Sequence, residues 1–174
     1  PHRIKEGYGL NDETVAAARA FGAGLFIALD CGITSVREAA SLKVAGIDAV
    51  IIDHHEPPDV LPDAYAILNP KQKGCSYPYR ELASAGLAFK VVQALETPDF
   101  CDYLDLVALG TVADVAPLQG ENRIFVRHGL DVLNRTRREG IKSLVGAAGI
   151  KEKRISTHVI SFMLAPRLNA SGRI

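Results

Sequence analysis

Apolar residues in the first half of the chain form short runs, separated by segments with helical spacing. Residues 24–30 (GLFIALD) and 49–53 (AVIID) are unbroken apolar runs before their last residue, as expected of strands buried on both faces. Residues 65–68 form a third run. Between the first two, residues 35–38 (SVRE) fit a capping box, and apolar residues recur at helical spacing as far as Gly46. The order strand, helix, strand predicts a βαβ unit with a parallel sheet.

Helical spacing also covers most of the remaining sequence. A first helix is expected between Asn11, as its N-cap, and Gly22. Beyond a loop at residues 71–79, helices are expected at residues 82–95, 101–113, 121–134 and 156–165, the last ended by Pro166. We therefore predict one α/β domain over residues 1–174, Rossmann-like, in which helices flank a parallel sheet and the second half is helical.

The composition is that of an ordinary globular chain. Hydrophobic residues make up 48% of the sequence, and no apolar run approaches the roughly 18 residues of a membrane span, so no membrane partner is expected. Three widely spaced cysteines argue against a disulfide framework or a thiolate zinc site and favour a cytoplasmic location. Because the one methionine is Met163, Pro1 is not a translation start, and we expect the chain to be part of a longer protein.

Charge is distributed unevenly, although the net charge is zero. Residues 1–120 carry 9 basic and 16 acidic residues, whereas residues 121–154 carry 9 basic and 4 acidic residues. An acidic half followed by a basic half suits a site that binds cations and then a polyanion. It equally suits solvated helix faces on a surface of mixed charge.

Two of the predicted strands end in an aspartate. Asp30 precedes Cys31-Gly32, and Asp53 precedes His54-His55. Ligands of parallel sheets bind beyond the carboxyl ends of the strands, so these side chains should meet at one edge. Carboxylates and imidazoles together favour Mn²⁺, Mg²⁺ or Fe²⁺. A single aspartate at a strand end is more often a turn residue, but the Asp-His-His triplet after an apolar run is more specific.

Two later segments carry further candidates. Asp114 lies in an otherwise apolar helical stretch, where a buried carboxylate is costly unless it is paired or binds metal; a helix-end cap is the alternative. After Pro166, a glycine-containing turn carries Arg167, Asn169 and Arg173. Forked guanidinium groups suit phosphate recognition, although a solvated charged loop is the more ordinary interpretation.

Taken together, these segments resemble the DHH phosphoesterase superfamily, and within it the RecJ family of single-strand-specific DNA exonucleases. Asp53-His54-His55 is similar to the signature triplet, residues 28–32 (ALDCG) to the preceding Asp-x-Gly motif, and residues 108–114 (ALGTVAD) to the later aspartate motif. Further segments that look like RecJ sequences are Arg3 with Gly7-Tyr8-Gly9, residues 69–78 and residues 166–173 (PRLNASGR). The domain would be truncated at both ends, with the family's first Asp-x-Asp motif and its C-terminal subdomain outside these 174 residues.

The resemblance implies metal-assisted phosphodiester hydrolysis with two Mn²⁺ or Mg²⁺ ions about 3.5–4 Å apart. Carried over by motif, Asp30, His54 and Asp114 would bind one metal. His55 would face the scissile phosphate or the leaving oxygen, and Asp53 would orient a histidine. The residues implied in substrate binding are Arg3, Arg167, Asn169 and Arg173. The implied substrate is single-stranded DNA, degraded from 5′ to 3′ in repair and recombination, with a DNA-repair helicase or a single-strand-binding protein as partner.

Two other functions remain open. A DHH-type phosphatase acting on short oligonucleotides or small nucleotides would use the same chemistry, and the length of strand bound would distinguish it. A non-catalytic DHH-fold scaffold of a replication assembly would have no reason to keep converging acids. Without the first Asp-x-Asp motif, the chain by itself is expected to fold, to bind divalent metal weakly or not at all, and to leave DNA intact.

Overall fold

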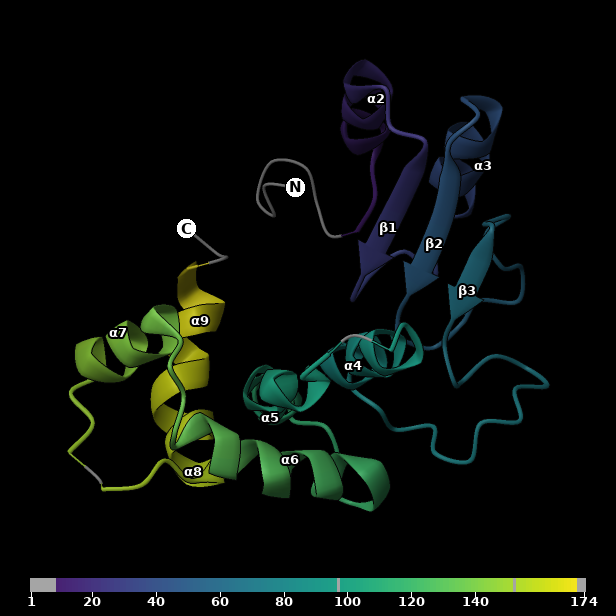
Figure 1. Cartoon of the computed structure of the whole chain (residues 1–174). Helices are drawn as coiled ribbons and strands as arrows, with labels where there is room; N and C mark the ends of the chain where they lie inside the picture. The colour runs from purple at the N-terminus through teal and green to yellow at the C-terminus, as the bar shows by residue number, and fades with distance from the viewer. Residues whose placement is uncertain (1–8, 97, 152, 172–174) are drawn as a thin grey trace. The chain divides into compact units, whose positions relative to one another are not determined.

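The computed structural model describes residues 9–96, 98–151 and 153–171. The chain divides into two compact units, Pro1–Arg80 (unit 1) and Glu81–Ile174 (unit 2), and each has its own architecture (Figure 1). Whether the two act as the single domain expected from the sequence stays a prediction. None of the described helices is long and apolar enough to cross a membrane.

Unit 1 contains a three-stranded parallel sheet. Its elements in chain order are α2 (Asp12–Phe21), β1 (Leu25–Leu29), α3 (Val36–Val44), β2 (Asp48–Ile52) and β3 (Ala66–Leu68). Figure 1 shows the three strands side by side and pointing the same way, with β2 in the middle. The predicted parallel sheet with flanking helices is confirmed.

The register of the sheet brings the ends of the three strands level. Leu29 pairs with Ile52, and Ile52 pairs with Leu68. The residue that follows each strand is polar, and these three residues form a row along one edge of the sheet: Asp30, Asp53 and Asn69.

A core of aliphatic side chains holds both helices of unit 1 against one face of the sheet. Its members come from α2, α3 and the strands: Val15, Ala18, Ala28, Leu42, Ala49 and Ile51. The other face of β1 is 53–54% exposed at Leu25, Ile27 and Leu29. The prediction that this strand is buried on both faces is therefore wrong, because successive side chains alternate and only one face of β1 meets the helices.

The helix ends of unit 1 follow the sequence in one case and depart from it in another. The side chain of Asn11 accepts a hydrogen bond from the Thr14 N–H at 2.8 Å, and Gly22 ends α2 with φ +69°, both as predicted. Ser35 occupies the N-cap position of α3, but its side chain makes no capping hydrogen bond. The capping box is therefore wrong in detail.

Unit 2 is helical in its described part. Its elements are α4 (Ser84–Ala94), the 3₁₀ turn η1 (Phe100–Tyr103), α5 (Leu104–Ala113), α6 (Gly120–Leu133), α7 (Glu139–Ala147), α8 (Thr157–Val159), the π turn η2 (Ile160–Leu164) and α9 (Ala165–Ser171). The sequence pattern does not predict α7. A Cβ at Gly129 would lie 2.2 Å from the Leu104 carbonyl oxygen, so only glycine allows α5 and α6 to approach this closely.

The last helix does not end at Pro166, which corrects the sequence prediction. The chain stays helical as far as Ser171. Proline lacks an N–H and its ring clashes with the carbonyl four residues earlier in an α-helix. Here the Ala165 N–H bonds to the carbonyl of Ile160, five residues back, and this wider π turn immediately precedes the proline. The expected turn at residues 166–171 is therefore helical.

Candidate metal centre

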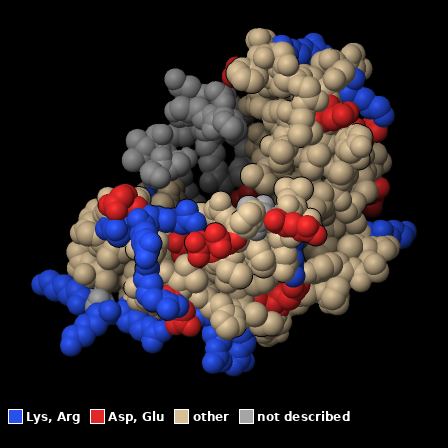
Figure 2. Space-filling model, viewed as in Figure 1, with Lys and Arg blue, Asp and Glu red and all other residues tan. Residues whose placement is uncertain are grey.

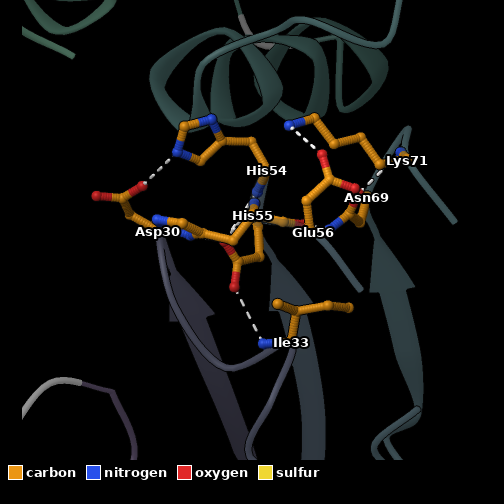
Figure 3. A network of polar contacts seen from close by, with 8 residues as sticks. Asp30, Ile33, His54, His55, Glu56, Asn69 and Lys71 are labelled. Carbon is orange, nitrogen blue, oxygen red and sulfur yellow. Dashed lines mark hydrogen bonds and ion pairs between the residues drawn. The ribbon is translucent and has the colours of Figure 1, made fainter. Parts of the chain in front are cut away.

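Three side chains able to bind metal gather where β1 and β2 end (Figure 3). Asp30 follows β1, and His54 and His55 follow Asp53 at the end of β2. One carboxylate oxygen or ring nitrogen from each of Asp30, His54 and His55 lies within 4.8 Å of the other two. The distance from Asp30 Oδ1 to His54 Nε2 is 3.4 Å. Adjacent ligands about 2.1 Å from an octahedral cation stand about 3 Å apart, so this separation fits a shared ion.

The turn after β1 sets the position of Asp30. Asp30 has φ +64° and Gly32 has φ +107°. A Cβ at Gly32 would lie 3.2 Å from the Cβ of Ala28 and 3.4 Å from a methyl carbon of Ile51, so this turn requires glycine. Left-handed backbone at a residue other than glycine is uncommon and concentrates at functional sites.

Asp53 is the buried anchor of the site, with a side chain 1% exposed. One carboxylate oxygen accepts the N–H of Ile33 at 3.0 Å. The other accepts the N–H groups of His54 and His55, at 2.8 and 3.2 Å, and lies 2.6 Å from Nδ1 of His55. The carboxylate therefore joins the turn after β1 to the loop after β2, and its oxygens are occupied within the protein.

Asp53 stays ionised and holds the ring of His55 through Nδ1. Burial by itself would raise the pKa of Asp53, but hydrogen bonds from the N–H groups of Ile33 and His55 and from the His55 ring lower it below its usual value. An ionised carboxylate beside Nδ1 of His55 favours the proton on that nitrogen. Nε2 of His55 is then the ring nitrogen that Asp53 leaves available to a metal or to substrate.

Cys31 lies between Asp30 and Gly32 and is not a member of the converging group formed by Asp30, His54 and His55. Burial raises the pKa of its thiol, and the negative charges of Asp53 and Asp30 raise it further. The thiolate, which is the form that binds metal, is therefore disfavoured at Cys31. The remaining donors are a carboxylate and two imidazoles, a set that fits Mn²⁺, Mg²⁺ or Fe²⁺.

Asn69 belongs to the site but was not among the residues given a role from the sequence. It is 3% exposed and follows β3. Its side-chain amide donates to the carbonyl of His55 at 2.9 Å, and its side-chain oxygen accepts the N–H of Lys71 at 2.8 Å. The signal that could have found it is its position, because it follows an apolar run just as Asp30 and Asp53 do.

Asp114 is placed in unit 2, at the C-cap of α5. Its N–H donates to the carbonyl of Gly110 at 2.9 Å, and its side chain is exposed. The expectation of a buried carboxylate is therefore wrong, because the helix ends at this residue and opens to solvent. Its membership of the cluster formed by Asp30, His54 and His55 stays a prediction.

The residues expected to bind substrate lie at the two ends of the sequence. Arg167 and Asn169 are exposed on α9, and the guanidinium group of Arg167 donates to the carbonyl of Met163 at 2.6 Å. Arg3 and Arg173 lie outside the described residues. A role in substrate binding stays a prediction for all four.

Val115 marks the backbone after Asp114 as strained. It is a β-branched residue with φ +58°, and its side chain is 87% exposed. A left-handed backbone costs a residue of this kind about 1–2 kcal/mol. Because the Val115 side chain is exposed, its packing offsets little of this cost. We expect Val115→Gly to raise the free energy of unfolding by about 1 kcal/mol in urea titrations, the net of relieved strain and glycine's greater chain entropy. An unchanged or lower value would mean that Val115 is held by packing and is not strained.

Basic side chains gather on unit 2. Figure 2 shows Lys and Arg over the part that carries α6, α7 and the segments around them, with acidic groups interspersed. Several of these acids are paired, as in the contacts between Arg154 and Asp131 at 2.5 Å and between Lys142 and Glu139 at 2.8 Å. Some of the basic residues between 121 and 154 are therefore neutralised by an acidic partner, and the net positive charge of this stretch comes from the others.

Unit 1 carries a row of polar residues and an Asp-His-His loop at one edge of its sheet, and comparison with known proteins gives the family. The family model described as the DHH family, N-terminal domain, matches residues 2–111. The chain belongs to this DHH family. Within it, the chain is similar to the RecJ proteins.

Two curated relatives show this similarity in sequence. The single-stranded-DNA-specific exonuclease RecJ of Bacillus subtilis is 48% identical over 176 residues, which take in 100% of this chain and 22% of the relative. RecJ of Salmonella typhimurium is 41% identical over 100% of this chain and 33% of the relative. The chain thus spans about a fifth to a third of the length of these relatives.

Solved structures agree. A crystal structure of exonuclease RecJ bound to manganese matches 99% of this chain and 44% of its own, with a TM-score of 0.85 and 34% identity. RecJ of Thermus thermophilus in complex with Mn²⁺ matches 92% of this chain and 24% of its own, with a TM-score of 0.78 and 32% identity.

Proposed function

We propose that this chain carries the metal-binding part of an exonuclease that hydrolyses phosphodiester bonds of single-stranded DNA from 5′ to 3′. One observation carries the proposal: Asp30, His54 and His55 bring their ligand atoms within 4.8 Å of one another at the carboxyl edge of a parallel sheet. The names and bound Mn²⁺ of the RecJ relatives and structures support it.

Each residue of the site has a distinct task in this proposal. Asp30 and His54, together with Asp114, hold a divalent metal. That metal, Mn²⁺ or Mg²⁺, supplies charge stabilisation at the phosphate and a more acidic water. Asp53 fixes the ring of His55 through Nδ1, so that Nε2 of His55 faces the phosphate or the leaving oxygen.

Contacts to the rest of the strand fall to residues outside the cluster. Arg3, Arg167, Asn169 and Arg173 bind phosphates of the single strand in this proposal. A helicase or a single-strand-binding protein is the kind of partner that would present such a strand. The three cysteines, all of which are free thiols, fit a reducing cytoplasm.

The test is a polarity assay with the full gene product that contains this chain. A single-stranded oligonucleotide, labelled at the 5′ end in one reaction and at the 3′ end in another, is incubated with Mn²⁺. We expect the 5′ label to appear first as a short product, while a blunt duplex of the same sequence persists and EDTA stops the reaction. Hydrolysis confined to di- and trinucleotides would point to the small-nucleotide phosphatase, and absence of any hydrolysis would contradict the proposal.

A further inference from the structure

Lys71 is a charged residue in the loop after β3 whose contacts place it beside the candidate metal centre. Its Nζ lies 2.9 Å from a carboxylate oxygen of Glu56, the residue that follows His55. Figure 3 shows the Lys71 side chain extending back over this loop toward Glu56, on the same side as the His54 ring. The ammonium group is therefore held beside the loop that carries the two histidines.

The ion pair with Glu56 does not by itself account for a lysine in this position. The Lys71 side chain is 21% exposed, whereas that of Glu56 is 81% exposed. An ion pair with so exposed a partner contributes little, about 0–1 kcal/mol, and it opens easily. Holding a long side chain mostly out of water costs rotamer freedom and solvation. A lysine placed this way is more readily explained by a second anion that arrives from solution.

The backbone at Lys71 is fixed relative to the histidines. Asn69 donates to the carbonyl of His55 and accepts the N–H of Lys71, so one buried amide side chain connects the two loops. Gln72 adds two hydrogen bonds, from its side-chain amide to the carbonyls of Ile67 and Asn69. The position of Lys71 beside the Asp-His-His loop is therefore built into the end of β3.

The carboxylates at this edge of the sheet would repel a polyanion, so a cation is needed there for one to approach. Asp30 follows β1, and Asp53 and Glu56 belong to the segment that follows β2, so three carboxylates lie within one short stretch of the edge. A nucleic-acid phosphate arriving here meets this negative charge. Metal bound to Asp30 and His54 offsets part of it, and an ammonium that can exchange a carboxylate for a phosphate offsets more.

We propose that Lys71 binds a phosphate of the DNA strand next to the metal centre, and that Asn69 is the positioning residue that holds it there. In the absence of DNA, the ammonium group of Lys71 pairs with the carboxylate of Glu56. When DNA binds, a phosphate takes the place of that carboxylate. The inference rests on the proposed function, since it assigns a further substrate contact to the same site.

The experiment measures KM and kcat of the full gene product on a single-stranded oligonucleotide with Mn²⁺, at several salt concentrations. Lys71→Ala is expected to raise KM about tenfold with kcat within about twofold, and to reduce the slope of log affinity against log salt by about 0.7, the value for one phosphate contact on a single strand. Lys71→Arg should recover part of the affinity. Glu56→Gln should lower KM, because it releases the ammonium and removes a negative charge.

Lys73→Ala is the matched control. Lys73 is an exposed lysine of the same loop, and no ion pair to it is found among the described residues, so removing it changes the same charge. Asn69→Ala should raise KM, as Lys71→Ala does. The affinity of Lys71→Ala for Mn²⁺, measured by calorimetry, should be unchanged.

An unaltered KM and salt slope for Lys71→Ala, or an equal effect of Lys73→Ala, would overturn the inference. A lower melting temperature for both Lys71→Ala and Lys71→Arg would show a structural role instead. Failure of the proposed function is distinguishable, because the unaltered protein would then leave single-stranded DNA intact.

Discussion

Asp53→Asn is expected to lower the free energy of unfolding of the chain by about 3 kcal/mol, because it removes a buried carboxylate whose two oxygens both accept hydrogen bonds. The two oxygens of Asp53 accept bonds from Ile33, His54 and His55. An asparagine has a single oxygen, and its NH₂ group would face one of these N–H donors. The loss should be visible as a lower midpoint in urea unfolding followed by circular dichroism.

Asp59→Asn is the control for this prediction, since Asp59 is exposed in the same unit and its loss should stay within about 0.5 kcal/mol. The effect should also depend on pH. The folded-state pKa of Asp53 is lowered, so its contribution is complete above the unfolded pKa of about 3.9 and is lost as the pH falls through the folded value. The difference in free energy of unfolding between the unaltered chain and Asp53→Asn should therefore shrink below about pH 4. A loss under about 1 kcal/mol at neutral pH would contradict the role of Asp53 as anchor.

Asp114→Asn is expected to reduce Mn²⁺-dependent hydrolysis by the full gene product at least about a hundredfold, while stability changes by less than about 0.5 kcal/mol. Partners that only orient a metal ligand cost 10–100-fold in affinity or activity when removed, and a ligand should cost more. Stability should survive because the carboxylate is exposed at the end of α5. The measurement is the initial rate on single-stranded DNA beside a melting curve.

Asp102→Asn provides the comparison, because Asp102 is an exposed aspartate of η1 in the same unit and should keep its full rate. Near-normal degradation of single-stranded DNA by Asp114→Asn would show that Asp114 is a helix cap and not a ligand. That outcome would leave Asp30 and His54 as the described ligands, with the ring of His55 beside them.

The sequence was most informative where position along a strand decides position in space. Asp30 and His54 are 24 residues apart in number, yet apolar runs that end in polar residues predicted that they meet, and the structure brings them to 3.4 Å. The same rule would have given Asn69, whose strand is level with the other two. It was missed because an asparagine before a proline is an ordinary loop residue.

What the sequence could not supply depends on side-chain geometry and on local energies of similar size. The bonds of Asp53 to both neighbouring loops depend on distances that no spacing encodes. The helix past Pro166 depends on a π turn that competes closely with ending the helix. The exposed face of β1 could not be told from a buried one, because all its residues are apolar.

The metal-binding role of Asp30 and His54, beside the ring of His55, is tested most directly by Mn²⁺ titration of the chain with the histidine ring signals followed by NMR. Mn²⁺ is paramagnetic and broadens the signals of nuclei close to it. We expect His54 and His55 to broaden first, ahead of His128 and His158, at Mn²⁺ concentrations that reflect weak binding. Asp30→Asn should raise the concentration needed at least about tenfold. Rings of His54 and His55 that stay sharp while other histidines broaden, or an unchanged titration in Asp30→Asn, would contradict a metal centre at this edge of the sheet.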